Sequence, residues 1–259
     1  MSPTPPTGRD REPRCPLGIC DGSGFVIDAD GETARDCECR GSRIAAIRIR
    51  SLAGRIPRRY QGVSFERPPV SDIARVAPEQ VRLVRRYAAE VEQNLDRGKG
   101  LWLEGNVGTG KTTLAMLVSK AALDAGRTVA IYSLPRLLSL LRESMDSEAG
   151  LVDFLDRLTA VDLLHIDDLG AENRTEWVLE QLYSIVNARY EAERAIVATT
   201  NLELPTELAE HLGARTVSRL AEICGDPIPL YGPDSRVEHR VEFPQHPEHA
   251  LLGEPAEHP

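Results

Sequence analysis

The stretch GNVGTGKT, residues 105–112, carries the residue types that a phosphate-binding loop requires. It fits G-x-x-x-x-G-K-[ST] at every fixed position, and its glycines allow backbone amides to turn inward around a phosphate. Lys111 can reach the β- and γ-phosphates, and Thr112 can ligate magnesium. We therefore predict a nucleotide site made by Gly105, Asn106, Val107, Gly108, Thr109, Gly110, Lys111, Thr112 and Thr113.

Two adjacent aspartates end the apolar stretch LLHID within LLHIDDLG, residues 163–170. Asp167 is expected to hold magnesium, directly or through water, and Asp168 to orient and polarise the attacking water. Glu172 is a second candidate base, although a carboxylate at the start of a helix is its more common role. We expect His165, on the same stretch, to be packed in the core.

A further polar residue, Asn201, ends the apolar stretch AIVATTN, residues 195–201. In open parallel sheets ligands lie beyond the carboxyl ends of the strands, so Asn201 could face the γ-phosphate. An asparagine at the end of a strand is also a common turn former, so spacing leaves both interpretations open.

The chain has five cysteines, and four of them, Cys15, Cys20, Cys37 and Cys39, lie within the first forty residues. The spacing of the first pair is within the range of zinc modules, and the spacing of the second is tighter than usual. A segment too short for a large core would gain stability from a tetrahedral metal site. We predict a structural zinc there, with four unconnected thiols as the alternative, and interpret Cys224 as a small apolar residue.

Hydrophobic periodicity predicts the elements that must position these residues. Short apolar stretches alternate with longer amphipathic ones, which implies a mostly parallel sheet covered by helices on both faces. We expect strands at 101–105, 128–134, 162–167 and 195–201, and helices at 78–98, 111–126, 135–145, 151–158 and 175–193. The segment 55–70 is expected to be an extended connector because three prolines interrupt it.

Charge is distributed unevenly along the chain. The net charge is −9, yet residues 40–60 contain seven arginines and no acid. A local basic segment on an acidic chain indicates a dedicated contact with an anionic partner, either DNA or an acidic protein surface. The amino-terminal residues contain no apolar run typical of a secretory signal, and no long apolar stretch could span a bilayer, so we expect a cytoplasmic protein without a membrane contact.

Composition also predicts four regions. Residues 1–12 are expected to form a disordered tail, 13–56 a zinc-binding and basic amino-terminal module, 57–237 the nucleotide-binding domain, and 238–259 a second disordered tail rich in histidine and proline.

Five segments together, GNVGTGKTT, LLHIDDLGAEN, TEWVLEQLYSIVNARYE, AIVATTNL and LGARTVSRLAE, resemble the AAA+ ATPases of the DnaC/DnaI helicase-loader group and the related IstB transposition helpers. The likeness covers about residues 58–236. It implies an α/β fold, a P-loop AAA+ domain with a mostly parallel sheet flanked by helices, preceded by a small zinc-binding amino-terminal module. It also implies that Asn201 is a sensor of the γ-phosphate, Arg219 a finger inserted into a neighbouring subunit, with Arg215 as a nearby alternative, and Arg236 a second sensor.

The function implied by this resemblance is an ATP-binding and ATP-hydrolysing DNA replication protein that recruits a replicative helicase and loads it onto single-stranded DNA. The expected cofactors are ATP, magnesium and a structural zinc. The expected partners are a DnaB-like helicase, single-stranded DNA and further copies of the chain, associated through the ATPase domain. Two alternatives stay open: an IstB-like transposition helper, and a non-catalytic ATP-binding zinc adaptor, since Asp168 stands where many relatives have glutamate.

Overall fold

The computed structural model describes residues 15, 17–27, 33–40, 56–145, 148–202, 205–232 and 234. Both predicted tails and most of the basic segment, residues 41–55, lie outside the described residues. The boundaries of the four regions therefore stay predictions.

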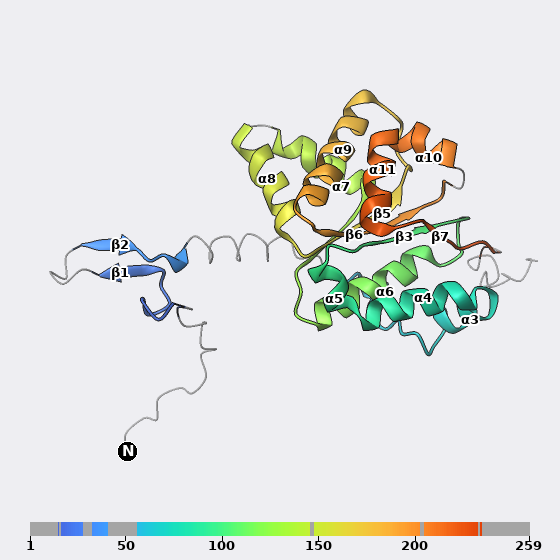
Figure 1. Cartoon of the computed structure of the whole chain (residues 1–259), viewed down its shortest axis with the longest axis horizontal. Helices are drawn as coiled ribbons and strands as arrows, with labels where there is room; N and C mark the ends of the chain where they lie inside the picture. Colours follow the sequence, from blue (N-terminus) through green and yellow to red (C-terminus); the bar gives the residue numbers. More distant parts are fainter. Residues whose placement is uncertain are drawn as a thin grey trace, which may run out of the picture.

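A five-stranded parallel sheet forms the centre of the larger unit (Figure 1). The strands lie in the order β4-β5-β6-β3-β7. Their bounds are β3 Leu101–Glu104, β4 Val129–Ser133, β5 Leu163–Leu169, β6 Ala195–Thr200 and β7 Ile228–Pro229. All six residues of β6 are buried, as expected for a strand inside a parallel sheet whose two faces are covered.

Helices cover both faces of this sheet (Figure 1). On one face lie α3 Val70–Val76, α4 Pro78–Ala89, α5 Val91–Asp96 and α6 Lys111–Asp124. On the other lie α7 Leu134–Ser144, α8 Glu148–Ala160, α9 Glu176–Glu191, α10 Pro205–Leu212 and α11 Ala214–Cys224. A short helix, α2 Arg58–Gln61, precedes them in the chain. The predicted α/β class, with helices flanking a parallel sheet, is confirmed.

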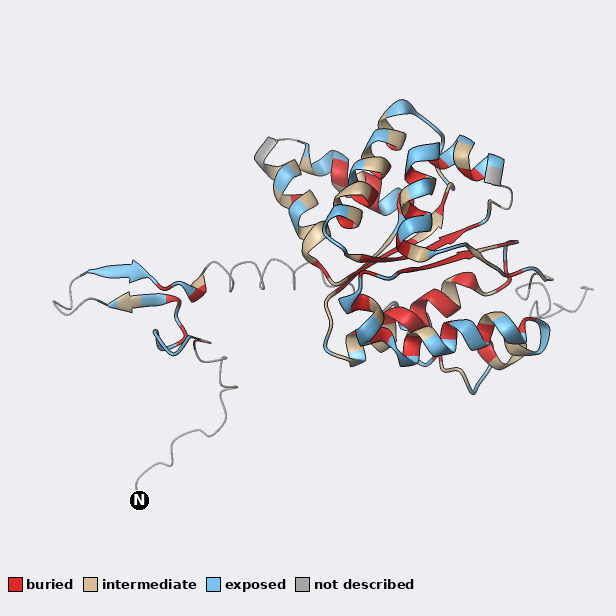
Figure 2. Ribbon diagram, in the orientation of Figure 1, coloured by how far each residue is buried: buried red, intermediate tan, exposed pale blue. Residues whose placement is uncertain are grey.

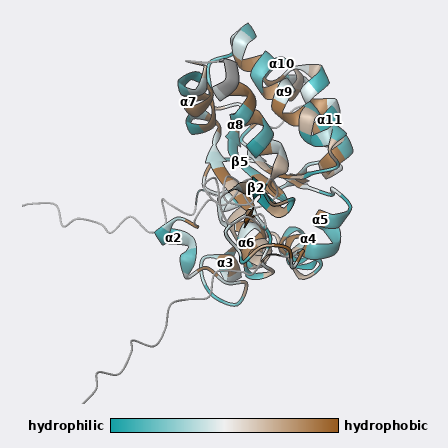
Figure 3. Cartoon of the chain, turned by 90° about the vertical axis from the view of Figure 1, so that its left-hand side faces the viewer, coloured by the Kyte–Doolittle hydropathy of each residue, from teal (hydrophilic) through white to brown (hydrophobic). Residues whose placement is uncertain are grey.

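Strand alternation divides the buried residues into two hydrophobic cores. Leu163 and Val197 pack with α6, whereas Leu164 and Ile196 pack with the helices of the opposite face. Figure 2 shows the buried residues concentrated in the sheet and on the helix surfaces that face it. Figure 3 shows the same division by hydropathy, with hydrophilic residues on the outer helix surfaces. None of the helices in the described ranges combines the length and the hydropathy that a membrane crossing demands.

The structure differs from the sequence-based expectation in several elements. The helices α3 and α10 were not among those expected. The helix expected at 78–98 is interrupted at Glu90, so that α5 can turn Val91 and Leu95 into the core beside α6. The connector expected at 55–70 is not wholly extended, because its described part contains α2. The fifth strand, β7, was not predicted, because two residues carry no periodic pattern.

A buried arginine of α9 joins three segments of the larger unit. Arg189 is 0% exposed, and its guanidinium donates to the backbone carbonyls of Leu158 (2.5 Å), Thr159 (3.5 Å), Val161 (3.1 Å), Asp162 (3.2 Å) and Ala195 (2.7 Å). Burial lowers the pKa of Arg189 to about 9, so the side chain stays charged at neutral pH. The cation therefore neutralises the carboxyl end of α8 and fixes the starts of β5 and β6.

The described part of the amino-terminal region is an antiparallel hairpin, with β1 at Phe25–Ile27 and β2 at Ala34–Asp36. Val26 packs against the four clustered cysteines, which form a small hydrophobic cluster of their own. Arg40 forms an ion pair with Asp36, and its guanidinium lies 4.0 Å from the centre of the Phe25 ring.

Candidate nucleotide site and cysteine cluster

The glycine-rich loop connects β3 to the amino end of α6, between a strand and a helix as the sequence predicted. Gly105, Gly108 and Gly110 have φ values of 135°, 80° and 97°, which side chains rarely tolerate. Lys111 is 5% exposed, and its Nζ donates to the carbonyls of Gly105 and Asn106, both at 2.6 Å. The ammonium is therefore held inside the loop.

Close neighbours explain why the loop needs glycine. A Cβ at Gly105 would lie 1.9 Å from the carbonyl oxygen of Leu230, and one at Gly110 would lie 2.2 Å from Cδ1 of Ile73. One at Gly108 would lie 1.8 Å from Oδ1 of Asp234. The loop is thus enclosed between α3 and a carboxyl-terminal segment.

We call this segment the strap, residues 228–232 and 234. Its β7 pairs with β3, and the amide of Leu230 donates to the carbonyl of Glu104 at 2.7 Å. The strap then crosses the loop, so that the half-buried Asp234 places its carboxylate against Gly108. An acid at a phosphate-binding loop was not anticipated from the sequence, because only the pairing of β7 brings it there.

The paired aspartates lie in a β-bulge between β5 and β6. Ile166 is opposite Ala198 and Leu169 is opposite Thr200, so two residues of β5 face one of β6. Asp168 adopts the left-handed region, with φ 59°. Thr199 fixes the bulge, because its Oγ1 donates to Oδ1 of Asp167 (2.7 Å) and accepts from the backbone amide of Asp168 (2.9 Å). Sequence analysis gave Thr199 no role.

Strand alternation puts Asp167 and His165 on the sheet face that α6 covers. His165 is fully buried, as expected, and its Nδ1 shares a hydrogen bond of 2.8 Å with Oγ of Ser119 on α6. Burial lowers the pKa of His165 to about 3, so the ring is neutral at physiological pH. Glu172 does not line the nucleotide cavity described next.

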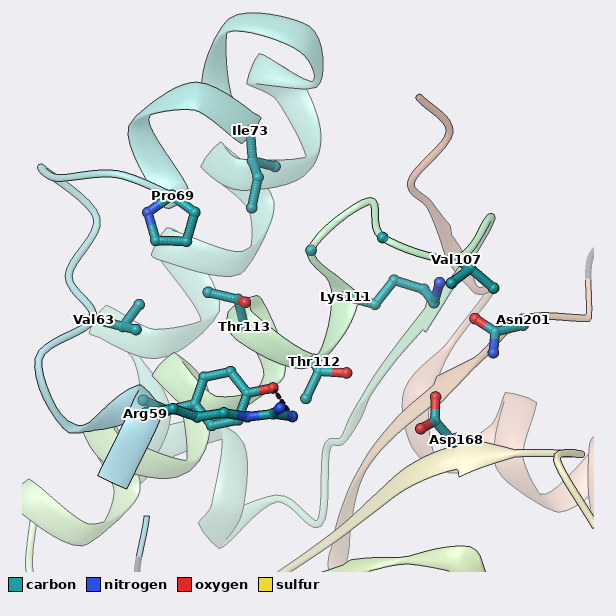
Figure 4. Close-up of a pocket in the computed structure, with 13 residues that line it drawn as sticks. Arg59, Val63, Pro69, Ile73, Val107, Lys111, Thr112, Thr113, Asp168 and Asn201 are labelled. Atoms are coloured by element: carbon teal, nitrogen blue, oxygen red, sulfur yellow. Dashed lines mark hydrogen bonds between the residues drawn. The ribbon is translucent and has the colours of Figure 1, made fainter. Parts of the chain in front are cut away.

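A cavity of about 320 Å³ opens above the loop (Figure 4). From the predicted site it is lined by Val107, Gly108, Gly110, Lys111, Thr112, Thr113, Asp168 and Asn201. Asp168 and Asn201, from the ends of two different strands, lie across from Thr112 in Figure 4. Asp167, Gly105, Asn106 and Thr109 are not among the lining residues, although Asp167 directly precedes Asp168.

The opposite wall of the cavity comes from residues that sequence analysis did not assign to the site: Arg59, Tyr60, Val63, Pro69 and Ile73. Three of these are apolar and offer a surface suited to a base or a ribose. The one sequence signal for this wall was its position at the start of the predicted nucleotide-binding domain, residues 57–237.

The arginines assigned by resemblance lie elsewhere or outside the described residues. Nη1 of Arg219 is 2.8 Å from Oε1 of Glu222, and its guanidinium lies 4.0 Å from the centre of the Tyr190 ring. Arg219 and the exposed Arg215 line a separate hollow of about 440 Å³ on α11, together with Tyr183. Arg236 lies outside the described residues.

The four clustered cysteines bring their sulfur atoms within 4.8 Å of one another. Sγ of Cys15 is 3.9 Å from that of Cys37, and Sγ of Cys20 is 3.6 Å from that of Cys39. All four are free thiols. Four sulfurs at the usual zinc distance would be separated by about 3.8 Å in a tetrahedron, so this set fits a zinc ion.

Backbone and burial act differently on the cysteines of the cluster. Hydrogen bonds from the backbone, the strongest at Cys20, lower the pKa of Cys15 to about 6, which favours the thiolate that a metal needs. Burial raises the pKa of Cys39 to about 12. The buried Cys39 thiol is therefore costly to ionise without a cation, and a zinc ion would supply one.

The fold and site define the class of protein. The phosphate loop follows β3, the paired aspartates end β5, and β6 lies between these two strands with Asn201 after it. This is the arrangement of an AAA+ ATP-binding domain. Residues 82–218 match the family described as "IstB-like ATP binding protein", and the chain belongs to that family.

Distant relatives extend this assignment. The phage-like element PBSX protein XkdC of Bacillus subtilis (strain 168) is 27% identical over 236 residues, which cover 86% of this chain and 84% of XkdC. The crystal structure of the DnaC helicase loader superposes with a TM-score of 0.56 at 26% identity, covering 68% of this chain and 99% of that one. The crystal structure of DnaI gives a TM-score of 0.55 at 27% identity, covering 72% and 98%. The resemblance to the DnaC/DnaI group is confirmed.

Proposed function

We propose that this protein is an ATP-driven loader that recruits a replicative helicase and delivers it onto single-stranded DNA. The observation that supports this most is the meeting of Lys111, Thr112, Asp168 and Asn201 at one cavity, in an AAA+ chain similar over most of its domain to a DnaC helicase loader. The basic segment 40–60 offers arginines for an anionic partner.

The geometry supports a specific division of roles for hydrolysis. The loop amides and the positive end of α6 would bind the phosphates, and Lys111 would transfer its hydrogen bonds from loop carbonyls to phosphate oxygens. Thr112 and Asp167 would hold magnesium, which would neutralise charge on the phosphate oxygens. Asp168 would accept a hydrogen bond from the attacking water, and Asn201 would contact the γ-phosphate.

The ATPase activity is tested with Lys111→Ala, with and without single-stranded DNA and a replicative helicase. Lys99→Ala is a control of the same residue type, because Lys99 is exposed and does not line the cavity. We expect stimulated turnover that Lys111→Ala abolishes and Lys99→Ala leaves intact. If turnover is not stimulated and Lys111→Ala has no effect on it, the hypothesis of an ATPase is contradicted and an ATP-binding adaptor is favoured.

A transposition helper is the second candidate, because the family that the chain matches is described as IstB-like. The two candidates differ in partner. A loader places a ring-shaped helicase on a single-stranded region that has no free end, so that the helicase can unwind the adjoining duplex. A transposition helper does not stimulate this unwinding and binds a transposase instead. Failure to stimulate helicase loading, together with ATP-dependent binding of a transposase, would replace the first candidate by the second.

Self-association is part of the proposal, with Arg219 as the finger that one copy supplies to the next. Arg219 is engaged by Glu222 and Tyr190 within its own chain, so assembly has to release it. Mixing Lys111→Ala with Arg219→Ala subunits tests this, because each mixed interface of the correct polarity pairs an intact loop with an intact finger. We expect each variant to be inactive alone and the mixture to recover part of the turnover. If instead Arg219→Ala is active alone, and Arg215→Ala is inactive alone but recovers in the mixture, the finger is Arg215.

We also propose that Cys15, Cys20, Cys37 and Cys39 hold one structural zinc ion. The support is that the four sulfur atoms lie within 4.8 Å of one another, close enough to share one tetrahedral zinc ion. Metal analysis of the purified protein should find about one zinc per chain and a clear loss in Cys37→Ser. Zinc well below this level, unchanged by Cys37→Ser, would contradict the assignment.

A further inference from the structure

The structure separates Arg59 from the other arginines of the basic segment. From the sequence, Arg59 was one of seven arginines available to an external anionic partner. In the structure both Arg58 and Arg59 are exposed, but Arg59 lines the nucleotide cavity with Lys111 and Thr112 and Arg58 does not. Figure 4 shows the Arg59 side chain extended along the wall toward Thr112.

The Arg59 guanidinium is held in a defined place by Tyr60. Nη2 of Arg59 donates to the hydroxyl of Tyr60 at 2.6 Å, and the guanidinium lies 4.6 Å from the centre of the Tyr60 ring. Such stacking leaves other N–H groups of the guanidinium available for an anion. A surface arginine that is not held by a neighbouring tyrosine would lose more side-chain entropy when it binds an anion.

The helix that carries Arg59 is fixed to the phosphate-loop helix. Tyr60 and Val63 pack into the hydrophobic core that includes α6, and Nζ of Lys120 on α6 donates to the carbonyl of Gln61. The amide of Val63 donates to the carbonyl of Tyr60 at 3.2 Å. The position of Arg59 relative to Thr112 is therefore set by packing.

Charge favours the phosphate chain as the target of Arg59. Among the described residues that line the cavity, the positively charged ones are Lys111 and Arg59, and Asp168 is an acid at the same cavity. A nucleotide triphosphate brings three to four negative charges, which Lys111 alone would not balance. Guanidinium groups bind phosphate oxygens through two parallel N–H donors.

We infer that Arg59 binds the phosphate chain of the nucleotide from α2, with Tyr60 as its platform. This inference rests on the proposed nucleotide site and adds to it a phosphate-binding residue outside the phosphate loop. It also gives the start of the nucleotide-binding domain a direct contact with the ligand, so the last residues of the basic segment 40–60 respond to nucleotide binding.

The test compares Arg59→Ala with the matched control Arg58→Ala in the full chain. Equilibrium affinities are measured for ATP and for inorganic tripolyphosphate, which keeps the phosphates and lacks the base. We expect Arg59→Ala to weaken both ligands by about tenfold to a hundredfold, the range for a hydrogen-bonded charge pair. Arg58→Ala should bind both as the wild type does, and Arg59→Lys should lie between Arg59→Ala and the wild type.

Three results would overturn the inference: equal losses in Arg58→Ala and Arg59→Ala, no loss in Arg59→Ala, or a loss for ATP without one for tripolyphosphate. The last would mean a contact with the base. Far-ultraviolet circular dichroism and thermal unfolding show whether Arg59→Ala is folded, and Tyr60→Phe, which keeps the ring, should give a smaller loss of the same kind. If the wild type binds neither ligand, the proposed nucleotide site itself fails.

Discussion

Asp168 is both a proposed base and a residue in an unusual backbone conformation. Its φ of 59° lies in the left-handed region, which aspartate and asparagine tolerate better than other residues with side chains. The bulge that Thr199 fixes imposes this conformation. The backbone therefore offers a physical reason for aspartate at this position.

This reason leads to a stability prediction for Asp168. Asp168→Glu should lower the free energy of unfolding by about 1 kcal/mol, because glutamate lacks the local tolerance of the left-handed region. Asp168→Asn should keep the stability and lose hydrolysis. Urea denaturation measures the first effect and a turnover assay the second; equal stability of the two variants would argue against backbone strain as the reason for aspartate.

His165 predicts a pH dependence of stability. Its pKa is lowered by burial to about 3, so the native state binds fewer protons than the unfolded state, in which histidine has a pKa of about 6.5. This contribution is present above about pH 6.5 and is lost as the pH falls toward 3, by up to about 1.4 kcal/mol per pH unit.

Denaturation of the wild type and of His165→Asn between pH 4 and pH 8 measures this contribution. The slope of unfolding free energy against pH should be smaller in His165→Asn, since the variant has no ring to protonate. Parallel slopes would show that other groups cause the acid sensitivity.

The residues of the phosphate loop could be predicted because eight consecutive residues, 105–112, form the whole motif. Asp168 and Asn201 were found because each follows an apolar strand. Thr199, Tyr60 and Asp234 could not be assigned in this way. Their positions at the site depend on strand register, on the docking of α2 and on the pairing of β7, which no local pattern encodes.

At the scale of elements, Arg189 connects α8, β5 and β6. Replacing it with methionine would keep much of the packing and leave several buried carbonyls without a donor. We expect Arg189→Met to lower the free energy of unfolding by about 3–5 kcal/mol, the range for removing one partner of a buried charged network.

Arg194→Met is the matched control for Arg189→Met. Arg194 lies five residues on and pairs with Asp162 at 3.1 Å, with 39% of its side chain exposed. It should cost about 1 kcal/mol or less, as partly exposed ion pairs do. Equal losses in guanidinium chloride titrations of the two variants would contradict a special role for the buried network.

The strap gives a prediction for ligand affinity. The Asp234 carboxylate lies against Gly108, where phosphate oxygens need the loop, and like charges at this distance repel. We expect Asp234→Asn to raise the affinity for ATP by about threefold to tenfold. Asp226→Asn, at an exposed acid just before β7, should have no effect, and weaker binding in Asp234→Asn would instead mean that the carboxylate helps to hold magnesium.

The layers of the fold could be predicted, because most of its strands and helices are long enough for the spacing of their hydrophobic residues to show which element they form. The expected strands at 101–105 and 195–201 match β3 and β6 closely. The interruption at Glu90 and the two-residue β7 were missed for a physical reason: both are set by contacts with α6 and β3, and neither changes the local pattern.

At the scale of the whole molecule, the cysteine cluster and the sheet have separate hydrophobic cores. A strong chelator should therefore unfold the amino-terminal hairpin while the thermal transition of the nucleotide-binding domain changes by less than about 2 °C. Calorimetry with and without chelator measures this, and a large shift of the main transition would show that the two cores depend on each other.

The strap also links nucleotide binding to the binding of any partner that contacts the strap. A nucleotide and the Asp234 carboxylate use the same loop, so a partner that binds the strap only when it is away from Gly108 strengthens nucleotide binding. Thermodynamic reciprocity then requires the nucleotide to strengthen that partner's binding by the same factor, and each factor of ten corresponds to about 1.4 kcal/mol of coupling free energy. The two-residue strand beside β3 thereby couples the strap to nucleotide occupancy.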